Sequence, residues 1–545
     1  MNKKYVVIKT IAIFLCWLCI VSVTGCSSKE QSNSNELQTV ISAGTTDDTE
    51  ATEDWFADIN SVSSEEISDA LVDIDVNQVG YQPDDKKIAI VHNDYGSDTY
   101  TIVDESGNTV FSGRLSGYIM DNVTNEQVRI ADFSNFCMPG TFYVMCGDES
   151  ESFPFQIDDE LYGEKIQGII ETLLGMHSEW TLEESAMNNE MDIATVGVTS
   201  IYNSEETKEV TGGWQATKES GRYVISACKS CADLLLAYEL YGEGLSQELT
   251  SMKDKTLGNV ILEEVKYEVN WMLKMQDEDT GAVYTKVSGR YEGDSTQWVF
   301  SPSTNATGDF AAVMAMCSRI YQSEDKNFAQ DCLGAAKKAW TFLENNKNLI
   351  SFENPDGVTT KEFADSVDAD ERYWAACELY KATGNGRYRE YISEYMNLYG
   401  EQSAEEEVKS SFRLTEVSGY GDIAYLTTRG FRTDEGYKEK INAKIVEVAE
   451  WANCVEESEP YGVVIGDKEG QDIEKIASDA TLLMLAGTIQ GNKDYVQLAS
   501  RYVDYLLGAN PSSINYMDCL LGEEKDENTI EFVATFSLLL AGCKD

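Results

Sequence analysis

The residues whose types could best carry out a reaction lie in the stretch 212–224, which reads GGWQATKESGRYV. The adjacent glycines Gly212 and Gly213 allow a turn that other residues resist. Trp214 can offer a flat apolar face, and Glu219 adds a carboxylate. Such residues can build a loop that binds and cleaves a polysaccharide. They also suit an ordinary loop that leads into a helix, so the choice depends on the rest of the chain.

The composition of the chain limits its partners. Its 545 residues are enough for two or three domains, and 95 acidic against 42 basic residues give a formal net charge of −53. Nucleic acid binding needs a positive surface, so we expect no nucleic acid partner and no anionic ligand. A neutral ligand such as an uncharged sugar polymer stays open. The alternative is an acidic surface that only keeps the protein soluble.

The N-terminal segment predicts export from the cytoplasm. Lysines at positions 3, 4 and 9 precede an apolar run at 11–23, which is too short for a transmembrane helix. The run leads into the small residues Thr24 and Gly25 and then Cys26, which resembles a bacterial lipoprotein cleavage site. We expect residues 1–26 to be a lipoprotein signal peptide, with lipid on Cys26 and the protein on the extracellular face of the cell membrane. A plain signal peptide with a chance cysteine is the alternative.

The histidines predict no zinc site, and the cysteines leave the disulfide state open, because 13 cysteines in an exported chain would suggest disulfides. Of the 13 cysteines three lie in the leader, and the others mostly occupy positions where a helix needs a small apolar residue, as at Cys317, Cys332, Cys377 and Cys543. The whole chain has only two histidines, His92 and His177, so no zinc site is predicted.

Two composition shifts divide the mature chain. Residues 27–72 are rich in Ser, Thr, Asn, Asp and Glu, which predicts a disordered linker because such a segment cannot bury a core. Residues 73–158 contain short β-rich runs separated by turn residues, which predicts a small immunoglobulin-like β-sandwich.

From residue 159 the apolar residues recur at helical spacing. We predict an all-α domain over 159–545 in which twelve helices form six hairpins closed into an (α/α)6 barrel. An open α-solenoid is the alternative, but no fixed repeat is visible. The predicted helices cover 162–177, 222–241, 256–276, 304–322, 326–346, 368–382, 386–398, 418–429, 434–455, 472–490, 492–507 and 527–542.

Several motifs in this order resemble glycoside hydrolase family 9, the inverting cellulases, in the subgroup with an N-terminal immunoglobulin-like domain. The resemblance spans residues 73–545. It implies an (α/α)6 barrel that cleaves β-1,4-glucan, acts as an endoglucanase and needs no cofactor. It also implies a β-glucan polysaccharide or oligosaccharide as the partner of a monomeric protein. Calcium often accompanies the family, but no ligand cluster can be assigned in this sequence. The motifs are VNQVGY at 76–81, WMLKMQ at 271–276, SPS at 301–303, TGDFAAV at 307–313, YWAACELY at 373–380 and YLLGANP at 505–511.

Inverting hydrolysis needs two carboxyl groups, an acid that protonates the leaving oxygen and a base that activates a water on the opposite face. By resemblance, the acid is a glutamate that opens the last helix, and Glu527 falls on that position. The alternative is that Glu527 is an ordinary first-turn acid of a helix.

The base position lies in the opening stretch. Family members usually carry two aspartates there, separated by alanine and glycine, and the alignment places Ala216 on the first and Glu219 on the second. Ala216 cannot hold a water through its side chain. Glu219 is one methylene longer than aspartate, and Lys218 beside it favours the ionised, weaker base. The alternative for Glu219 is an exposed acid at the start of the next helix.

A third departure follows Pro511, where the family usually has a loop with histidines and an arginine that contact substrate. This chain lacks that loop, so stabilisation of the transition state should fall. We therefore expect a weakened hydrolase. The alternative is an inactive glucan-binding or scaffold protein at the cell surface.

Several side chains are candidates for substrate binding. We expect Trp214, Arg222, Tyr223 and Trp298 to contact sugar, with Trp298 the better platform because it lies in a Gly/Asp/Ser-rich loop. Trp180 is a further candidate platform. Tryptophans inside helical patterns are read as core: Trp271, Trp340, Trp374 and Trp451.

Overall fold

A computed structural model describes most of the chain from residue 73 onward. The chain divides into two units, 1–50 and 51–545, and every described residue belongs to the second. The predicted signal peptide, Cys26 and the linker lie outside the described residues. No helix of the described part is both long and apolar enough to cross a membrane. The described ranges are 73–122, 124–147, 150–177, 198–204, 206–216, 220–246, 255–294, 296–363, 365–399, 411–463, 473–520 and 527–544.

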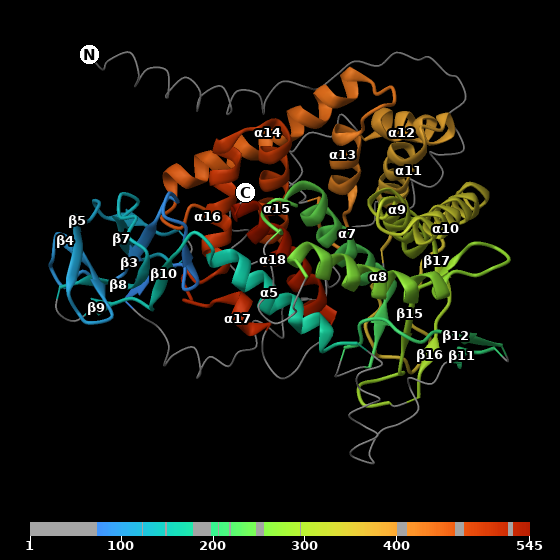
Figure 1. The fold of residues 1–545 in the computed structure, drawn as a ribbon, viewed down its shortest axis with the longest axis horizontal. Coiled ribbons are helices and arrows are strands. Elements are labelled where there is room, and N and C mark those ends of the chain that lie inside the picture. Colours follow the sequence, from blue (N-terminus) through green and yellow to red (C-terminus); the bar gives the residue numbers. More distant parts are fainter. Residues whose placement is uncertain are drawn as a thin grey trace, which may run out of the picture. The chain divides into compact units, whose positions relative to one another are not determined.

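The N-terminal part is a sandwich of two sheets, as predicted (Figure 1). One sheet has the order β1 (Ile74–Asp75), β3 (Ile88–Val91), β7 (Gln127–Asp132), β6 (Ile119–Met120). The other has the order β2 (Gly80–Tyr81), β10 (Phe155–Ile157), β8 (Gly140–Cys146), β4 (Thr99–Asp104), β5 (Thr109–Arg114), and β9 (Ser150–Glu151) pairs with β8. Alternate residues of β8 are buried in the core, as the two-residue period of a strand requires.

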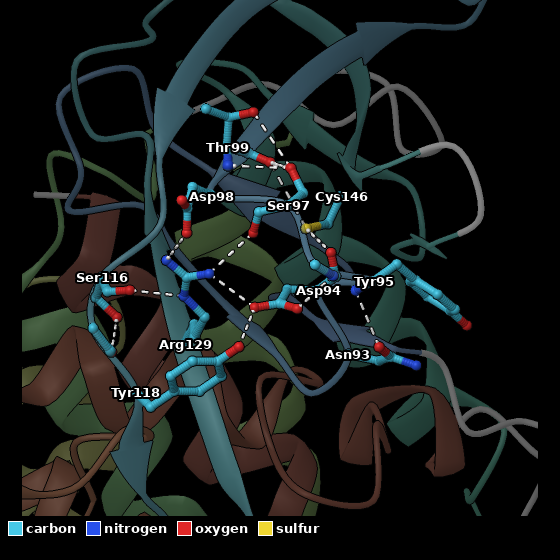
Figure 2. Close-up of polar contacts among 12 residues, drawn as sticks. Asn93, Asp94, Tyr95, Ser97, Asp98, Thr99, Ser116, Tyr118, Arg129 and Cys146 are labelled. Carbon is cyan, nitrogen blue, oxygen red and sulfur yellow. Dashed lines mark hydrogen bonds and ion pairs between the residues drawn. The ribbon is translucent and has the colours of Figure 1, made fainter.

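Arg129 on β7 joins the loop between β3 and β4 to the sheet (Figure 2). Its guanidinium donates to Asp94 at 2.8 Å and to Asp98 at 3.2 Å, and it lies 5.1 Å from the ring centroid of Tyr118. The Tyr118 hydroxyl also donates to Asp94 at 2.7 Å. The bonds from Arg129 and Tyr118 lower the pKa of Asp94 to about 2, so this carboxylate stays charged over the whole neutral range.

Twelve long helices follow in the described part of the chain, and their contacts arrange them as an inner and an outer layer, as the sequence predicts. The six inner helices pack in a closed cycle, in which each contacts the next and the last contacts the first. They are α7 (Val224–Leu240), α9 (Thr304–Ile320), α11 (Ala369–Thr383), α13 (Ser418–Thr427), α15 (Ile473–Gln490) and α18 (Glu527–Lys544). The outer helices are α5 (Leu161–Leu174), α8 (Leu257–Met275), α10 (Lys326–Asn345), α12 (Gly386–Leu398), α14 (Glu435–Ser458) and α16 (Lys493–Leu506). This is the predicted (α/α)6 barrel.

The inner helices all begin at the same end of the barrel. Near the starts of α9 and α11, Asn305 donates to Glu371 at 2.8 Å. Near the starts of α11 and α13, the Val417 amide donates to Asp370 at 2.9 Å.

The inner-helix pairs α13–α15 and α7–α18 are also parallel. Arg413, just before α13, donates to Glu474 in the first turn of α15 at 2.8 Å. Lys229 in the second turn of α7 donates to Thr535 in the third turn of α18 at 3.0 Å. The chain segments that enter the inner helices therefore gather at one end, which we call the entry end.

A small five-stranded sheet lies at the entry end, because it is built from the two connections that lead into α7 and α9. Its order is β12 (Thr207–Glu209), β11 (Val198–Ile201), β16 (Trp298–Val299), β15 (Lys286–Ser288), β13 (Arg222–Tyr223). The strands β14 (Val283–Tyr284) and β17 (Pro302–Ser303) pair separately before α9. The sheet thus connects the predicted catalytic stretch to the segment that carries Trp298.

Most described cysteines are buried, in agreement with the sequence prediction. All ten are free thiols, and six of them are buried. Burial raises the pKa of the Cys228 and Cys231 thiols on α7, so both stay neutral as packing groups.

Candidate active site

Trp214 is held inside the protein by two carboxylates of the outer helix α8. Its backbone amide donates to Glu268 at 2.6 Å, and its indole N–H lies 3.3 Å from Glu264. His177 contacts the same Glu264 oxygen at 2.8 Å. Because only 1% of Trp214 is exposed, its ring leaves no open face for a sugar. The tryptophan that we expected to bind substrate anchors the loop instead.

The glycine pair and Arg222 complete this anchorage. Gly212 and Gly213 have φ of +90° and +92°, which favours glycine. A Cβ on Gly213 would lie 2.8 Å from the Trp271 ring, so no larger residue fits without movement. The buried Arg222 guanidinium donates to the Val210 carbonyl at 2.6 Å and to the Gly212 carbonyl at 2.5 Å. We call Gly212, Gly213, Trp214 and Arg222 the loop frame.

The centre of the loop is closed by a backbone bond. The Ala216 amide donates to the Gly221 carbonyl at 3.0 Å, and Ser220 has φ of +51°. Residues 217–219, which include Lys218 and the predicted base Glu219, lie outside the described residues. Ala216 is fully buried, so the position aligned with the family's first aspartate has an apolar side chain inside the protein.

Glu527 is the first residue of α18, as predicted for the acid. Its side chain lies outside the described residues. However, α18 runs beside α7 and in the same direction, since Glu531 faces Ser226 while Thr535, one turn later on α18, bonds to Lys229 at 3.0 Å and to Asp233 at 2.8 Å, one and two turns later on α7. The loop before α7 and the start of α18 therefore meet at the entry end. This is the arrangement that an acid and a base from these two segments require.

A polar network lies one turn further along the same helices. Lys229 contacts Asp233 at 3.0 Å, and Asp233 accepts from the Tyr420 hydroxyl at 2.6 Å. Glu531, one turn after Glu527, has a pKa raised to about 8, mainly because surrounding protein desolvates it. Glu531 is therefore protonated at neutral pH. The sequence prediction missed it, although its spacing of four residues from Glu527 was a usable signal.

Glu268 is a second carboxyl group whose pKa is raised. Burial raises the pKa of Glu268 to about 8, and the Trp214 amide and the Arg222 guanidinium only partly oppose that rise. The group that anchors the loop frame is thus neutral below about this pH.

The two other expected sugar contacts differ in exposure. Tyr223 is buried, and its ring centroid lies 5.0 Å from that of Phe363. Trp298 is partly exposed on β16. Among the four side chains that we expected to bind substrate, Trp298 is therefore the one with accessible ring surface. Trp180 lies outside the described residues.

The segment after Pro511 is attached to the β-sandwich. The side-chain amide of Gln78 donates to the Ser513 carbonyl at 2.6 Å, and the Ser513 hydroxyl donates to Asp75. Asp75 also accepts from the Tyr461 hydroxyl at 2.7 Å. The segment that carries substrate contacts in the resembling family here contributes, in its described part, to the junction of the two domains.

The described residues show no metal centre. No three His, Cys, Asp or Glu side chains among them gather closely enough to hold an ion. Burial raises the pKa of Asp370 at the start of α11 to about 7, and it also raises the pKa values of Glu371 and Asp309. Among these described residues no set of ligands for a calcium ion is assigned.

The chain belongs to glycosyl hydrolase family 9. The model of that family matches residues 174–526, and the model of the cellulase N-terminal ig-like domain matches residues 70–151. The first match covers more than half of the chain and ends directly before Glu527. Both domains thus agree with the resemblance drawn from the motifs.

Curated relatives and solved structures agree with this membership. Endoglucanase D of Acetivibrio thermocellus is 28% identical over 466 residues, which cover 82% of this chain and 72% of the relative. A cellodextrinase of Butyrivibrio fibrisolvens is 27% identical over 467 residues, covering 81% and 84% of the two chains. A metagenome-derived glycoside hydrolase family 9 endoglucanase has a TM-score of 0.70 at 26% identity, covering 81% and 84%. At such identities the chain is a divergent, endoglucanase-like member.

Proposed function

We propose that the protein hydrolyses internal β-1,4-glucosidic bonds of cellulose or a related glucan with inversion, at a reduced rate. The observation that carries this proposal is the parallel pairing of α7 and α18, which brings the segments of Glu219 and Glu527 to one end of the barrel. The family membership and the named activities of the relatives support the same substrate class.

In this proposal each carboxyl group has one task. Protonated Glu527 gives its proton to the glycosidic oxygen as the bond to the anomeric carbon breaks. Ionised Glu219 removes a proton from a water, whose oxygen attacks that carbon from the opposite face. The products are two shorter saccharides, and one carboxyl group has lost the proton that the other has gained.

Three features support the reduced rate. Ala216 is a buried apolar residue where the family usually has a carboxylate that helps to hold the water. Lys218 would stabilise the ionised form of Glu219 and weaken it as a base. The segment after Pro511 bonds to the β-sandwich through Ser513 and so does not offer the family's usual substrate contacts in its described part.

The second candidate is an inactive protein that binds glucan at the cell surface. The apolar side chain of Ala216 favours it, because a methyl group cannot hold the attacking water as a carboxylate can. In both cases the proposed lipid on Cys26 would hold the protein on the outer face of the membrane. We further propose that it acts as a monomer, without nucleic acid and without a required cofactor.

The test is hydrolysis of soluble cello-oligosaccharides by the purified protein. We expect slow release of shorter products, and Glu527→Gln should lower the rate by about 100-fold or more because proton donation is lost. Glu435→Gln is the matched control, since it changes the first residue of the outer helix α14. Release that stays the same in Glu527→Gln would overturn the acid assignment. Retention on insoluble cellulose without release would support the binding protein.

A further inference from the structure

The connections into α7 and α9 place a second group of aromatic residues at the entry end. Tyr202 directly follows β11, and Trp298 begins β16, which pairs with β11 in parallel register. Both side chains are partly exposed, and their ring centroids are 5.6 Å apart at an interplanar angle of 83°. We call this pair the aromatic corner. The two residues are 96 positions apart in the sequence, and the sheet brings them together.

The backbone and the neighbouring ring fix Tyr202. Its amide donates to the Val299 carbonyl at 2.9 Å. Its ring lies nearly parallel to that of the buried Phe300, with centroids 5.1 Å apart and an angle of 22°. A ring held in this way loses little conformational entropy when a ligand stacks on it.

Phe300, which packs against Tyr202, is held in place by its own contacts. Lys286 on β15 lies 5.0 Å from the Phe300 ring centroid and 5.3 Å from that of Phe352. Its ammonium group donates to Asn354 at 2.7 Å and to the Thr360 hydroxyl at 3.0 Å. The segment that contains Phe352 is thereby fixed beneath the corner.

Two buried polar atoms beside the corner lack hydrogen-bond partners among the described residues. They are Nε1 of Trp298, a donor, and Oε1 of Gln297, an acceptor. Gln297 is 7% exposed, and its amide nitrogen donates to the Ser220 carbonyl of the catalytic stretch at 2.8 Å. Because both atoms are buried, a bound sugar would not reach them, and it would instead stack its C–H faces on the partly exposed rings of Tyr202 and Trp298.

We propose that Tyr202 and Trp298 form a sugar-binding subsite that holds a glucan chain at a distance from the cleavage point. Strand spacing sets that distance: Trp298 lies two strands from β13, which follows the catalytic stretch, at about 10 Å. The subsite would therefore contact a different glucose unit from the one at the carboxyl groups. This inference takes its ligand class from the proposed function and adds the residues that bind the distant part of the chain.

The test is calorimetric titration of the full chain with cellobiose and with cellohexaose, in the Glu527→Gln background so that the ligand is not consumed. Tyr202→Ala and Trp298→Ala should each weaken cellohexaose binding about 5- to 20-fold through loss of stacking. Cellobiose binding should change less, because a short ligand need not occupy the subsite. Tyr202→Phe should restore the affinity, since it keeps the ring.

Tyr291→Ala is the matched control, because this exposed tyrosine lies in the same connection between β15 and β16. Cellohexaose affinity that is unchanged in both alanine variants, or equally weakened in Tyr291→Ala, would overturn the subsite. If the unsubstituted protein releases product while the variants bind normally, the subsite fails and the proposed function stands. If it binds with the expected losses and releases nothing, hydrolysis fails and the subsite stands. If it neither binds nor cleaves, both fail.

Discussion

The loop frame and the aromatic corner lie at the same end of the barrel, yet they use tryptophan in opposite ways. Trp214 in the frame is buried, and both of its nitrogen atoms face carboxylates of α8. Trp298 in the corner is partly exposed and packs at an angle against Tyr202. One ring holds a loop in shape, and the other keeps surface for a ligand.

The contacts of the frame explain how the stretch 212–224 can differ from the family at residues 216–219 and still hold the same backbone conformation at its ends. The contacts of the frame run to Glu264 and Glu268 on α8 and to backbone carbonyls, so they do not depend on residues 216–219. Substitutions at those positions would therefore leave the anchoring contacts of the frame in place. The residues that anchor the loop are therefore different from the residues that are proposed to carry out the reaction.

The largest effect that would test the comparison is expected at Trp214. Trp214→Ala should lower the free energy of unfolding by about 3–5 kcal/mol, because it leaves a large cavity and removes the indole contact with Glu264. Trp298→Ala should cost much less, since its ring is already partly exposed. Urea unfolding of the two variants measures the contrast. Equal losses would show that the corner is also part of the core.

An intermediate effect, on the rate of hydrolysis, is expected from substitutions at residues 216–219. The combined change Ala216→Asp, Thr217→Ala, Lys218→Gly and Glu219→Asp restores the family's usual pattern. It should raise the rate on cello-oligosaccharides about 10- to 100-fold, equivalent to about 1.4–2.7 kcal/mol of transition-state stabilisation. A melting temperature close to that of the unsubstituted protein is the control for folding. No gain in a folded variant would place the defect in the contacts after Pro511 instead.

The smallest effect concerns the pH dependence of the frame. Glu268 has a folded pKa of about 8 against an ordinary value of 4.5, so its contribution to stability is complete below 4.5 and is lost as the pH rises toward 8. Glu268→Gln keeps an oxygen that accepts from the Trp214 amide but cannot ionise. At pH 8 it should therefore be more stable than the unsubstituted protein, by on the order of 1 kcal/mol. Thermal unfolding at pH 5 and pH 8 measures this, and an equal difference at both values would contradict it.

The architecture was predictable because periodicity is a local signal. The three-and-four spacing of apolar residues predicted all twelve helices, and their number indicated six hairpins closed into a barrel. The short β-rich runs between residues 73 and 158 likewise gave the sandwich. Each of these patterns depends on neighbours within one element, which a sequence displays directly.

The site was predictable only in part, because its contacts join distant segments. The start of a helix at Glu527 could be placed by resemblance. Nothing near Trp214 indicates that α8, some 50 residues later, presents two carboxylates to it. Tyr202 went unnoticed for the same reason, since the strand that makes it part of a corner is 96 residues away.

The closed cycle of inner helices has a consequence for folding. Its last contact, between Lys229 on α7 and Thr535 on α18, joins residues 306 positions apart. Until α18 docks, the inner faces of α7 and α15 lack their neighbour and leave apolar surface uncovered. Contacts between such distant positions form slowly, so we expect the open ring to be a stage at which this chain is prone to aggregate. The helix that begins at Glu527 therefore both contributes the proposed acid and completes the barrel.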